Sequence, residues 1–218
     1  MRPGRSVFLS LLIAVAAPLT GTLVAGDAAA SVSVAVTLEG LLQETTLAVV
    51  ATPVEGRAVW ENNRIYTYTR IRLDRVVAGD APKAGDGNGA AQDVWVRTMG
   101  GIVGKIGQIV DGEPVLTPGR SCLLFLHPGP VGSYEVTARA QGQYPVIVDE
   151  RGQSIIIKSS AVGTVLQPHA ARLARAHTVL GAVGPVPLPM MAADAIHNRP
   201  LEEALRDVAA AYKRVHAG

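Results

Sequence analysis

Apolar and polar positions alternate along the middle of the chain, most clearly over Ile65–Val77. One set of positions there is apolar or threonine and the other is polar or aromatic: Ile65, Thr67, Thr69, Ile71 and Leu73 against Tyr66, Tyr68, Arg70, Arg72 and Asp74. Successive side chains of a strand point to opposite faces, so this period of two predicts a half-buried strand. Val94–Thr98 alternates in the same way, with Trp95 and Arg97 on its second face.

Two further runs are apolar without alternation, which is typical of strands buried on both faces. They are Thr45–Thr52, which Pro53 ends, and Ser121–Leu126. Weaker strand patterns cover four more ranges: Val103–Val110, Tyr134–Ala138, Tyr144–Val148 and Ser154–Lys158. Gly56–Asn63 reads as a turn-rich segment and Gly79–Gln92 as a Gly-rich loop. About seven short strands with regularly spaced turns predict a mainly β domain over residues 31–160, either an antiparallel barrel or a sandwich.

Helical periodicity lies on both sides of this β-rich region. The apolar residues of 201–215 fall on one face of a helix: Leu201, Leu205, Val208, Tyr212 and Val215. We therefore predict an amphipathic C-terminal helix. Thr37–Gln43 has a weaker helical pattern, and His169–Leu180 is compatible with a helix. Residues 161–218 are expected to form a helical extension that contains a Pro/Gly-rich linker at 181–189.

The first 30 residues have the pattern of a signal peptide. Arg2 and Arg5 precede the apolar run Val7–Ala17, and Ala28–Ala30 offers a small-residue cleavage site before Ser31. The apolar run is shorter than the roughly 20 residues that a membrane-spanning helix needs. The pattern predicts an exported protein, periplasmic or extracellular, with no transmembrane segment after cleavage.

The net charge limits the classes of partner that we expect, and the cysteine count limits the possible disulfides. The formal net charge is +2, and the loss of two arginines and one aspartate with residues 1–30 lowers it to +1. A nearly neutral chain has no general attraction to nucleic acid, so no nucleic-acid partner is expected. Cys122 is the only cysteine and lies in an apolar run. It cannot form an internal disulfide, and we expect it to be a small core residue.

The polar face of the Ile65–Val77 strand is the candidate binding surface. It carries Tyr66, Tyr68, Arg70 and Arg72, and two similar residues precede it in the sequence, Trp60 and Arg64. Aromatic residues interleaved with arginine are typical of barrel faces that stack bases or sugars. The alternative is an ordinary solvated strand face, on which tyrosines cover their cross-strand neighbours.

Several short segments resemble a group of exported bacterial proteins of unknown function. They are Thr45–Thr52, Tyr66–Thr69, Arg97–Gly101, Gly107-Gln108, Gly112–Pro114, Leu116–Gly119, Leu123–Leu126 and Gln141–Tyr144. The resemblance covers about residues 38–158 and implies a small OB-like β-barrel, but no activity. A looser resemblance extends to netrin-like modules, which include the tissue inhibitors of metalloproteinases. Those inhibitors chelate zinc through an N-terminal cysteine, whereas the expected first residue here is Ser31, so that mechanism does not carry over.

No catalytic motif is found, and no cofactor or metal site is predicted. The Asp86–Gly89 segment is similar to a calcium loop, but Ala90 and Arg97 occupy positions that need oxygen ligands. The sequence therefore favours an exported, non-enzymatic binding module whose partner is an unknown protein or an envelope polymer. Two alternatives stay open. One is a hydrolase or metal-dependent enzyme that uses dispersed residues such as Asp111, Glu113 and His127. The other is a carbohydrate- or polymer-binding barrel that uses Trp60, Tyr66, Tyr68 and Arg70.

Overall fold

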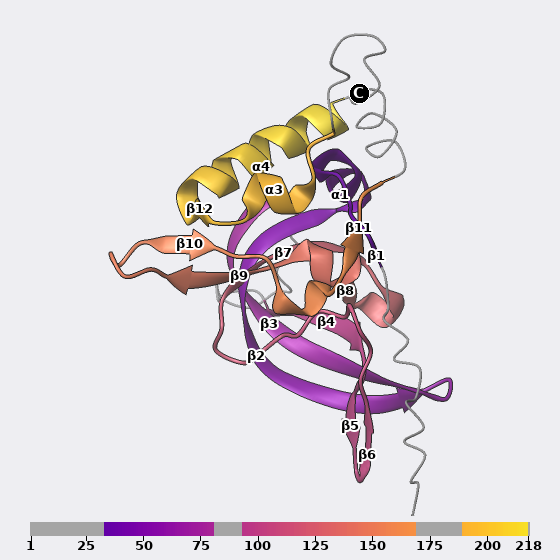
Figure 1. Cartoon of the computed structure of the whole chain (residues 1–218). Coiled ribbons are helices and arrows are strands. Elements are labelled where there is room, and N and C mark those ends of the chain that lie inside the picture. The colour runs from indigo at the N-terminus through magenta and orange to yellow at the C-terminus, as the bar shows by residue number, and fades with distance from the viewer. Residues whose placement is uncertain (1–32, 81–92, 169–188, 218) are drawn as a thin grey trace, which may run out of the picture.

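A long antiparallel hairpin dominates the structure, a computed structural model that describes residues 33–80, 93–168 and 189–217. The hairpin consists of β2 (Leu47–Glu61) and β3 (Arg64–Gly79) (Figure 1). The chain is mainly β with a C-terminal helix, as predicted. The expected signal peptide and the His169–Leu180 segment lie outside the described residues, as do most of the 79–92 loop and of the 181–189 linker.

The turn of this hairpin is much shorter than the sequence predicts. Gly56–Asn63 is not a turn-rich segment, because β2 continues to Glu61 and pairs residue by residue with β3. Only Asn62 and Asn63 connect the strands, with φ angles of 49° and 61°. Two central residues of positive φ match the right-handed twist of a hairpin, and asparagine tolerates that conformation. Cross-strand pairing therefore overrides the local turn tendency of the preceding residues.

The main sheet is mixed rather than purely antiparallel. Its eight strands have the order β12-β10-β9-β7-β2-β3-β4-β8, and β8 also pairs with β7. The pairings β7–β2–β3–β4–β8 therefore lead back to β7. Within this circuit only β4 and β8 are parallel. The remaining strands have these bounds: β4 Asp93–Met99, β7 Cys122–Pro128, β8 Tyr134–Val136, β9 Gln143–Val148, β10 Ser154–Ile156 and β12 Arg199–Pro200.

Several short elements lie outside this sheet. The predicted strand Val103–Val110 is wrong: the chain reverses at Gly104-Lys105 to give a small hairpin, because Gly104 adopts a φ of 62°. Similarly, β8 ends at Val136 because Ala138 has a φ of 55°. The short elements are β5 (Gly101–Val103), β6 (Ile106–Gln108), the parallel pair β1 (Ser33–Val34) and β11 (Val165–Leu166), and the 3-10 turns η1 (Pro130–Gly132), η2 (Arg139–Gly142) and η3 (Ser160–Val162).

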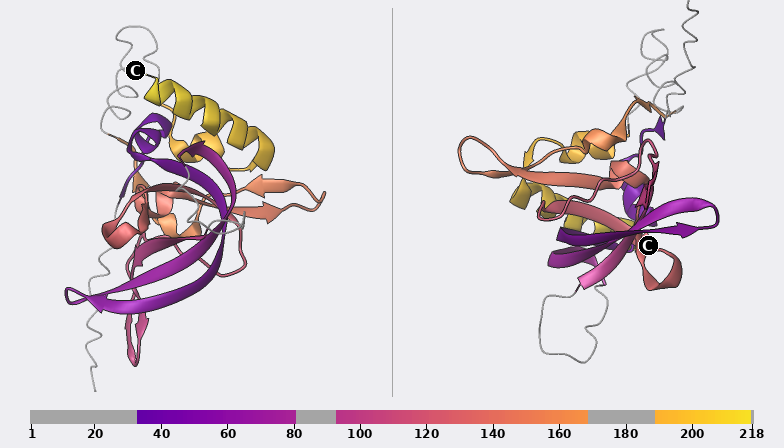
Figure 2. Two further views of the ribbon diagram at one scale, coloured as in Figure 1. Left: turned by 180° about the vertical axis from the view of Figure 1, so that it is seen from behind. Right: turned by 90° about the horizontal axis from the view of Figure 1, so that it is seen from below.

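Strands β2 and β7 separate two hydrophobic cores, which confirms the prediction that both are buried on two faces. In β7, Leu123 and Phe125 pack against the helices. Leu124 and Leu126 project to the opposite face, where they pack against residues of β2, β3 and β4. The helices are α1 (Leu38–Glu44), α3 (Ala192–Ile196) and α4 (Leu201–His216). They gather on one side of the sheet, away from the tips of the β2–β3 and β5–β6 hairpins (Figure 2). In the described residues no helix is long and apolar enough to cross a membrane.

Helix α4 leaves most of the polar face of β3 uncovered. It packs near the end of β3, where Arg75 forms a two-point ion pair with Glu202 at 3.0 Å. The Tyr212 hydroxyl donates to the Thr46 carbonyl at 3.4 Å, just before β2 begins. The β3 residues that pack with the helices are Val77 and Ala78, beyond the Tyr66–Arg72 stretch. Helix α4 therefore does not cover the Tyr66–Arg72 stretch, which carries most of the predicted binding residues.

Candidate functional site

The polar residues of β3 share one face with residues of both neighbouring strands. Tyr68 lies directly between Arg57 of β2 and Arg97 of β4, and Arg70 lies between Glu55 and Trp95. Directly paired residues of antiparallel strands project to the same side. We call this side of β2, β3 and β4 the outer face, because the opposite side contains the buried Ile65, Ile71 and Leu73.

Trp60 does not belong to the outer face, although the sequence groups it with the tyrosines. It pairs directly with Ile65, and so it projects to the opposite side of the sheet. Trp95 of β4 is the tryptophan of the outer face and is 41% exposed. The alternation within Val94–Thr98 was the available signal, because it places Trp95 and Arg97 together on one face.

Arg97 forms the centre of a hydrogen-bonded cluster that also contains Glu61, Tyr66, Tyr68 and Glu135. Its side chain is only 13% exposed and donates to Glu135 at 2.7 Å and to Glu61 at 2.9 Å. Its guanidinium carbon lies 3.5 Å from the centre of the Tyr66 ring, a cation–π contact. Tyr68 donates its hydroxyl to the other oxygen of Glu61 at 2.6 Å. We call these five residues the Arg97 cluster.

Three members of the Arg97 cluster, Glu61, Tyr68 and Arg97, have shifted pKa values. The Tyr68 hydrogen bond, followed by Arg97, keeps the pKa of Glu61 below its usual value. Burial, followed by Glu61, raises the pKa of Tyr68. Burial lowers the pKa of Arg97, but its hydrogen bonds to Glu135 and Glu61 outweigh that effect and raise it. Glu61 is therefore a carboxylate, Tyr68 a neutral phenol and Arg97 a cation.

Two arginines of β3, Arg70 and Arg72, also have carboxylate partners. Arg70 is paired with both Glu55 and Asp93, and Arg72 with Asp74 at 3.0 Å. The outer face, extended to β8 through Glu135, thus carries five arginines and five carboxylates: Arg57, Arg64, Arg70, Arg72 and Arg97, with Glu55, Glu61, Asp74, Asp93 and Glu135. Its formal charge is zero. Such a face lacks the excess positive charge that a phosphate backbone requires.

A groove of about 480 Å³ lies on one side of the Arg97 cluster, between Tyr68, Trp95 and the η1 turn. Arg57 and Glu61 add a donor and an acceptor to its lining. Val131 of η1 borders this groove, is 96% exposed and has a φ of 56°. A β-branched residue in the left-handed region is strained, and strain of this kind clusters at functional sites. We call this hollow the Trp95 groove.

A second pocket of about 570 Å³ lies on the other side of the Arg97 cluster. Arg64, Tyr66, Arg97 and Arg139 line it together with Glu113 and Glu135. Arg139 donates to Glu113 and to the Asp111 carbonyl, and Glu113 accepts from the Met99 amide at 2.9 Å. We call this hollow the Arg64 pocket.

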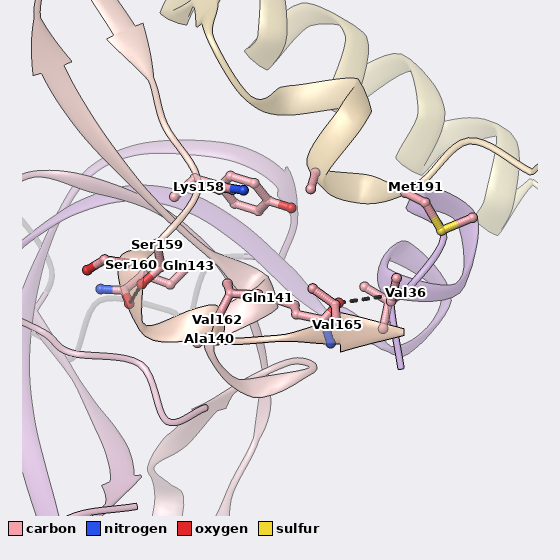
Figure 3. Close-up of a pocket in the computed structure, with 14 residues that line it drawn as sticks. Val36, Ala140, Gln141, Gln143, Lys158, Ser159, Ser160, Val162, Val165 and Met191 are labelled. Atoms are coloured by element: carbon pink, nitrogen blue, oxygen red, sulfur yellow. Dashed lines mark hydrogen bonds between the residues drawn. The ribbon is translucent and has the colours of Figure 1, made fainter. Parts of the chain in front are cut away.

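A third cavity is smaller, about 210 Å³, and lies where β1, β9, η3 and α3 meet (Figure 3). Two glutamine side chains at this cavity make hydrogen bonds to backbone groups that a neighbouring strand would otherwise satisfy. Gln141 accepts from the Val36 amide at 3.0 Å and donates to the Val34 carbonyl at 2.9 Å. Gln143 makes the same two-sided contact with Val115. The volume is below the ~300–1,000 Å³ of typical ligand pockets, so we assign these amides a structural role.

The residues of the enzyme alternative are not brought together. Glu113 is bound to Arg139, whereas His127 contacts Thr137 at 3.2 Å and Glu135 at 3.7 Å. Within the described parts of the chain, no three His, Cys, Asp or Glu residues are grouped so that they could hold a metal ion. Cys122 is 3% exposed, and burial raises the pKa of its thiol to about 12. This confirms it as a core residue and makes it a poor nucleophile.

No protein-family model and no curated protein matches this chain. The geometry of the outer face is therefore the basis for assigning a function. That face brings together five of the six candidate residues, all except Trp60: Arg64, Tyr66, Tyr68, Arg70 and Arg72. It adds Arg97 and Trp95, which the sequence interpretation did not include in the site.

Proposed function

We propose that the chain is an exported, non-enzymatic binding module built on a small OB-like β-barrel. The circuit of pairings from β7 through β2, β3, β4 and β8 back to β7 supports the barrel, because a closed circuit leaves no free edge among these strands. The resemblance of residues 38–158 to exported bacterial proteins supports the same fold. The signal-peptide pattern of residues 1–30 supports export to the cell envelope or beyond.

The proposed ligand is a saccharide chain of the cell envelope, bound across the outer face. The observation that carries this proposal is the Trp95 groove, in which Tyr68 and Trp95 offer ring surfaces beside the polar groups of Arg57 and Glu61. Sugar rings present C–H faces that pack on aromatic rings, and hydroxyls that bond to such polar groups. A neutral face favours this ligand over a polyphosphate, because its arginines and carboxylates are equal in number and Arg70, Arg72 and Arg97 already have carboxylate partners.

The binding test is co-sedimentation of the mature chain, without residues 1–30, with insoluble peptidoglycan sacculi. Replacement of Trp95 by alanine is expected to weaken retention by about fivefold, which corresponds to ~1 kcal/mol for the loss of one aromatic contact. The matched control is Trp60→Ala, since Trp60 is 49% exposed and lies on the opposite side of the sheet. The control variant is expected to retain wild-type binding.

Two outcomes would contradict the proposal. Wild-type protein that does not sediment with sacculi above the level of serum albumin would overturn the saccharide ligand. Equal weakening by Trp60→Ala and Trp95→Ala would overturn the outer face as the site. Export is tested separately by cell fractionation: a chain that stays in the cytosol with residues 1–30 attached would contradict that part.

A further inference from the structure

Arg64 is an arginine of the outer face whose expected partner is already engaged. It lies directly opposite Glu61 across the β2–β3 pair, where a cross-strand ion pair would be expected. One oxygen of Glu61 accepts from Tyr68 at 2.6 Å and the other from Arg97 at 2.9 Å. Among the described residues no carboxylate forms an ion pair with Arg64, which is exposed to solvent.

The Arg64 pocket therefore contains one guanidinium that forms no ion pair among the described residues. Its lining contains three arginines and two glutamates, so the formal charge is +1. Glu135 is bound to Arg97 and Glu113 to Arg139, which leaves the Arg64 guanidinium as the group without an internal partner there. The lining of the Trp95 groove contains one arginine and one glutamate, so its formal charge is zero. Since Glu61 is bound to Tyr68 and Arg97, Arg57 also forms no ion pair among the described residues. The two linings thus differ by one in formal charge, although each contains a guanidinium without an ion pair.

A single guanidinium matches a single carboxylate in charge and in geometry. The guanidinium fork can donate two parallel hydrogen bonds to the two carboxylate oxygens. A phosphate monoester carries a charge of about −1.5 to −2 near neutral pH and would be left partly uncompensated. Tyr66 also lines the pocket; Arg97 lies over one face of its ring, and the remainder of the ring is the surface beside the cation for the sugar that bears the anion.

We infer that the Arg64 pocket is an anion subsite that takes a carboxylate borne by the saccharide chain, while a neutral ring of the same chain occupies the Trp95 groove. This inference rests on the proposed function, since it specifies the charge pattern of the proposed ligand. The Arg97 cluster lies between the two hollows and contributes Tyr66 to one and Tyr68 to the other. The expected ligand alternates neutral and acidic sugars, as a peptidoglycan strand does when the lactyl groups on every second sugar are free acids.

The test compares two forms of one probe. Peptidoglycan strands are freed of their peptides by an amidase, and half of the sample is converted to neutral amides by carbodiimide coupling with ammonia. Wild-type protein is expected to bind the free acids about fivefold more tightly than the amides, the size of one charge-assisted hydrogen-bonded contact at an exposed site. Arg64→Gln should abolish this preference and still bind the amidated strands. Arg120→Gln, another exposed arginine that does not line either hollow, is the matched control and should keep the preference.

The outcomes separate this inference from the proposed function. Equal wild-type binding of both strand forms, or a preference that persists in Arg64→Gln, would overturn the carboxylate subsite and leave the saccharide proposal intact. Wild-type binding of neither form would overturn the proposed function. Competition with sodium phosphate and sodium acetate at equal ionic strength identifies the anion. Displacement by phosphate at lower concentration than by acetate would contradict the carboxylate assignment.

Discussion

The buried thiol of Cys122 makes the stability of this protein depend on alkaline pH in a measurable way. Cys122 is enclosed within β7, and its Sγ lies 3.8 Å from the Ala51 carbonyl oxygen. Burial first, and the negative charge of Asp74 second, raise the pKa of the thiol from 9.0 to about 12. The folded state holds the thiol proton more tightly than the unfolded state. The contribution of the thiol to the free energy of unfolding is therefore fully present below the unfolded pKa. It is lost as pH rises toward the folded pKa.

The size of the effect follows from proton linkage. Between these two pKa values the unfolded chain releases one proton that the folded chain keeps, so the free energy of unfolding falls by about 1.36 kcal/mol per pH unit. The expected loss relative to neutral pH is ~1.4 kcal/mol at pH 10 and approaches ~2.7 kcal/mol at pH 11. Replacement of Cys122 by alanine removes the titrating group and leaves all other groups unchanged.

The assay is urea unfolding of the wild type and of Cys122→Ala under reducing conditions at half-unit intervals from pH 7.5 to 10.5. The difference in unfolding free energy between the two proteins isolates the thiol, because tyrosines and lysines titrate in both. This difference should be constant up to about pH 8.5 and should then shift in favour of the alanine variant. A difference that stays constant to pH 10.5 would refute the reasoning, because it would show that the thiol titrates alike in both states.

Three further predictions concern the stability of the fold. Arg97→Met is expected to lower the unfolding free energy in urea by ~2 kcal/mol, below the ~3–5 kcal/mol of a fully buried pair because both carboxylates are partly exposed. An equal loss in Arg70→Met, which breaks two ion pairs of a more exposed arginine, would contradict the special role of the Arg97 cluster. Phe125→Ala should cost ~3–5 kcal/mol by calorimetry or urea, whereas Val131→Ala should cost nothing or stabilise. Gly142→Ala should prevent stable folding as judged by circular dichroism, since its Cβ would lie 2.1 Å from the Thr137 carbonyl oxygen.

Much of the local structure could be predicted from the sequence because it depends on local periodicity. The period of two in Ile65–Val77 correctly separated the buried Ile71 from the polar Arg70. The helical period of 201–215 similarly identified the face of α4 that packs on the sheet. Each of these patterns concerns a single strand or helix. It specifies only which side of that element is buried, and the hydrophobic effect determines that side.

The candidate site depended on contacts that no local pattern specifies. Trp60 and Tyr66 are close in sequence, yet the two-residue turn between β2 and β3 places them on opposite sides of the sheet. A shift of register by one residue would have reversed that placement. The sequence determined that a polar, aromatic face exists on β3. Only the pairing of β2 and β4 with β3, and of β8 with β4, decided that Arg97 lies at its centre and that Trp95 borders its groove. The same pairing leaves Arg64 without an ion pair among the described residues. Only the tertiary structure decided these relations, because they join residues far apart in the chain.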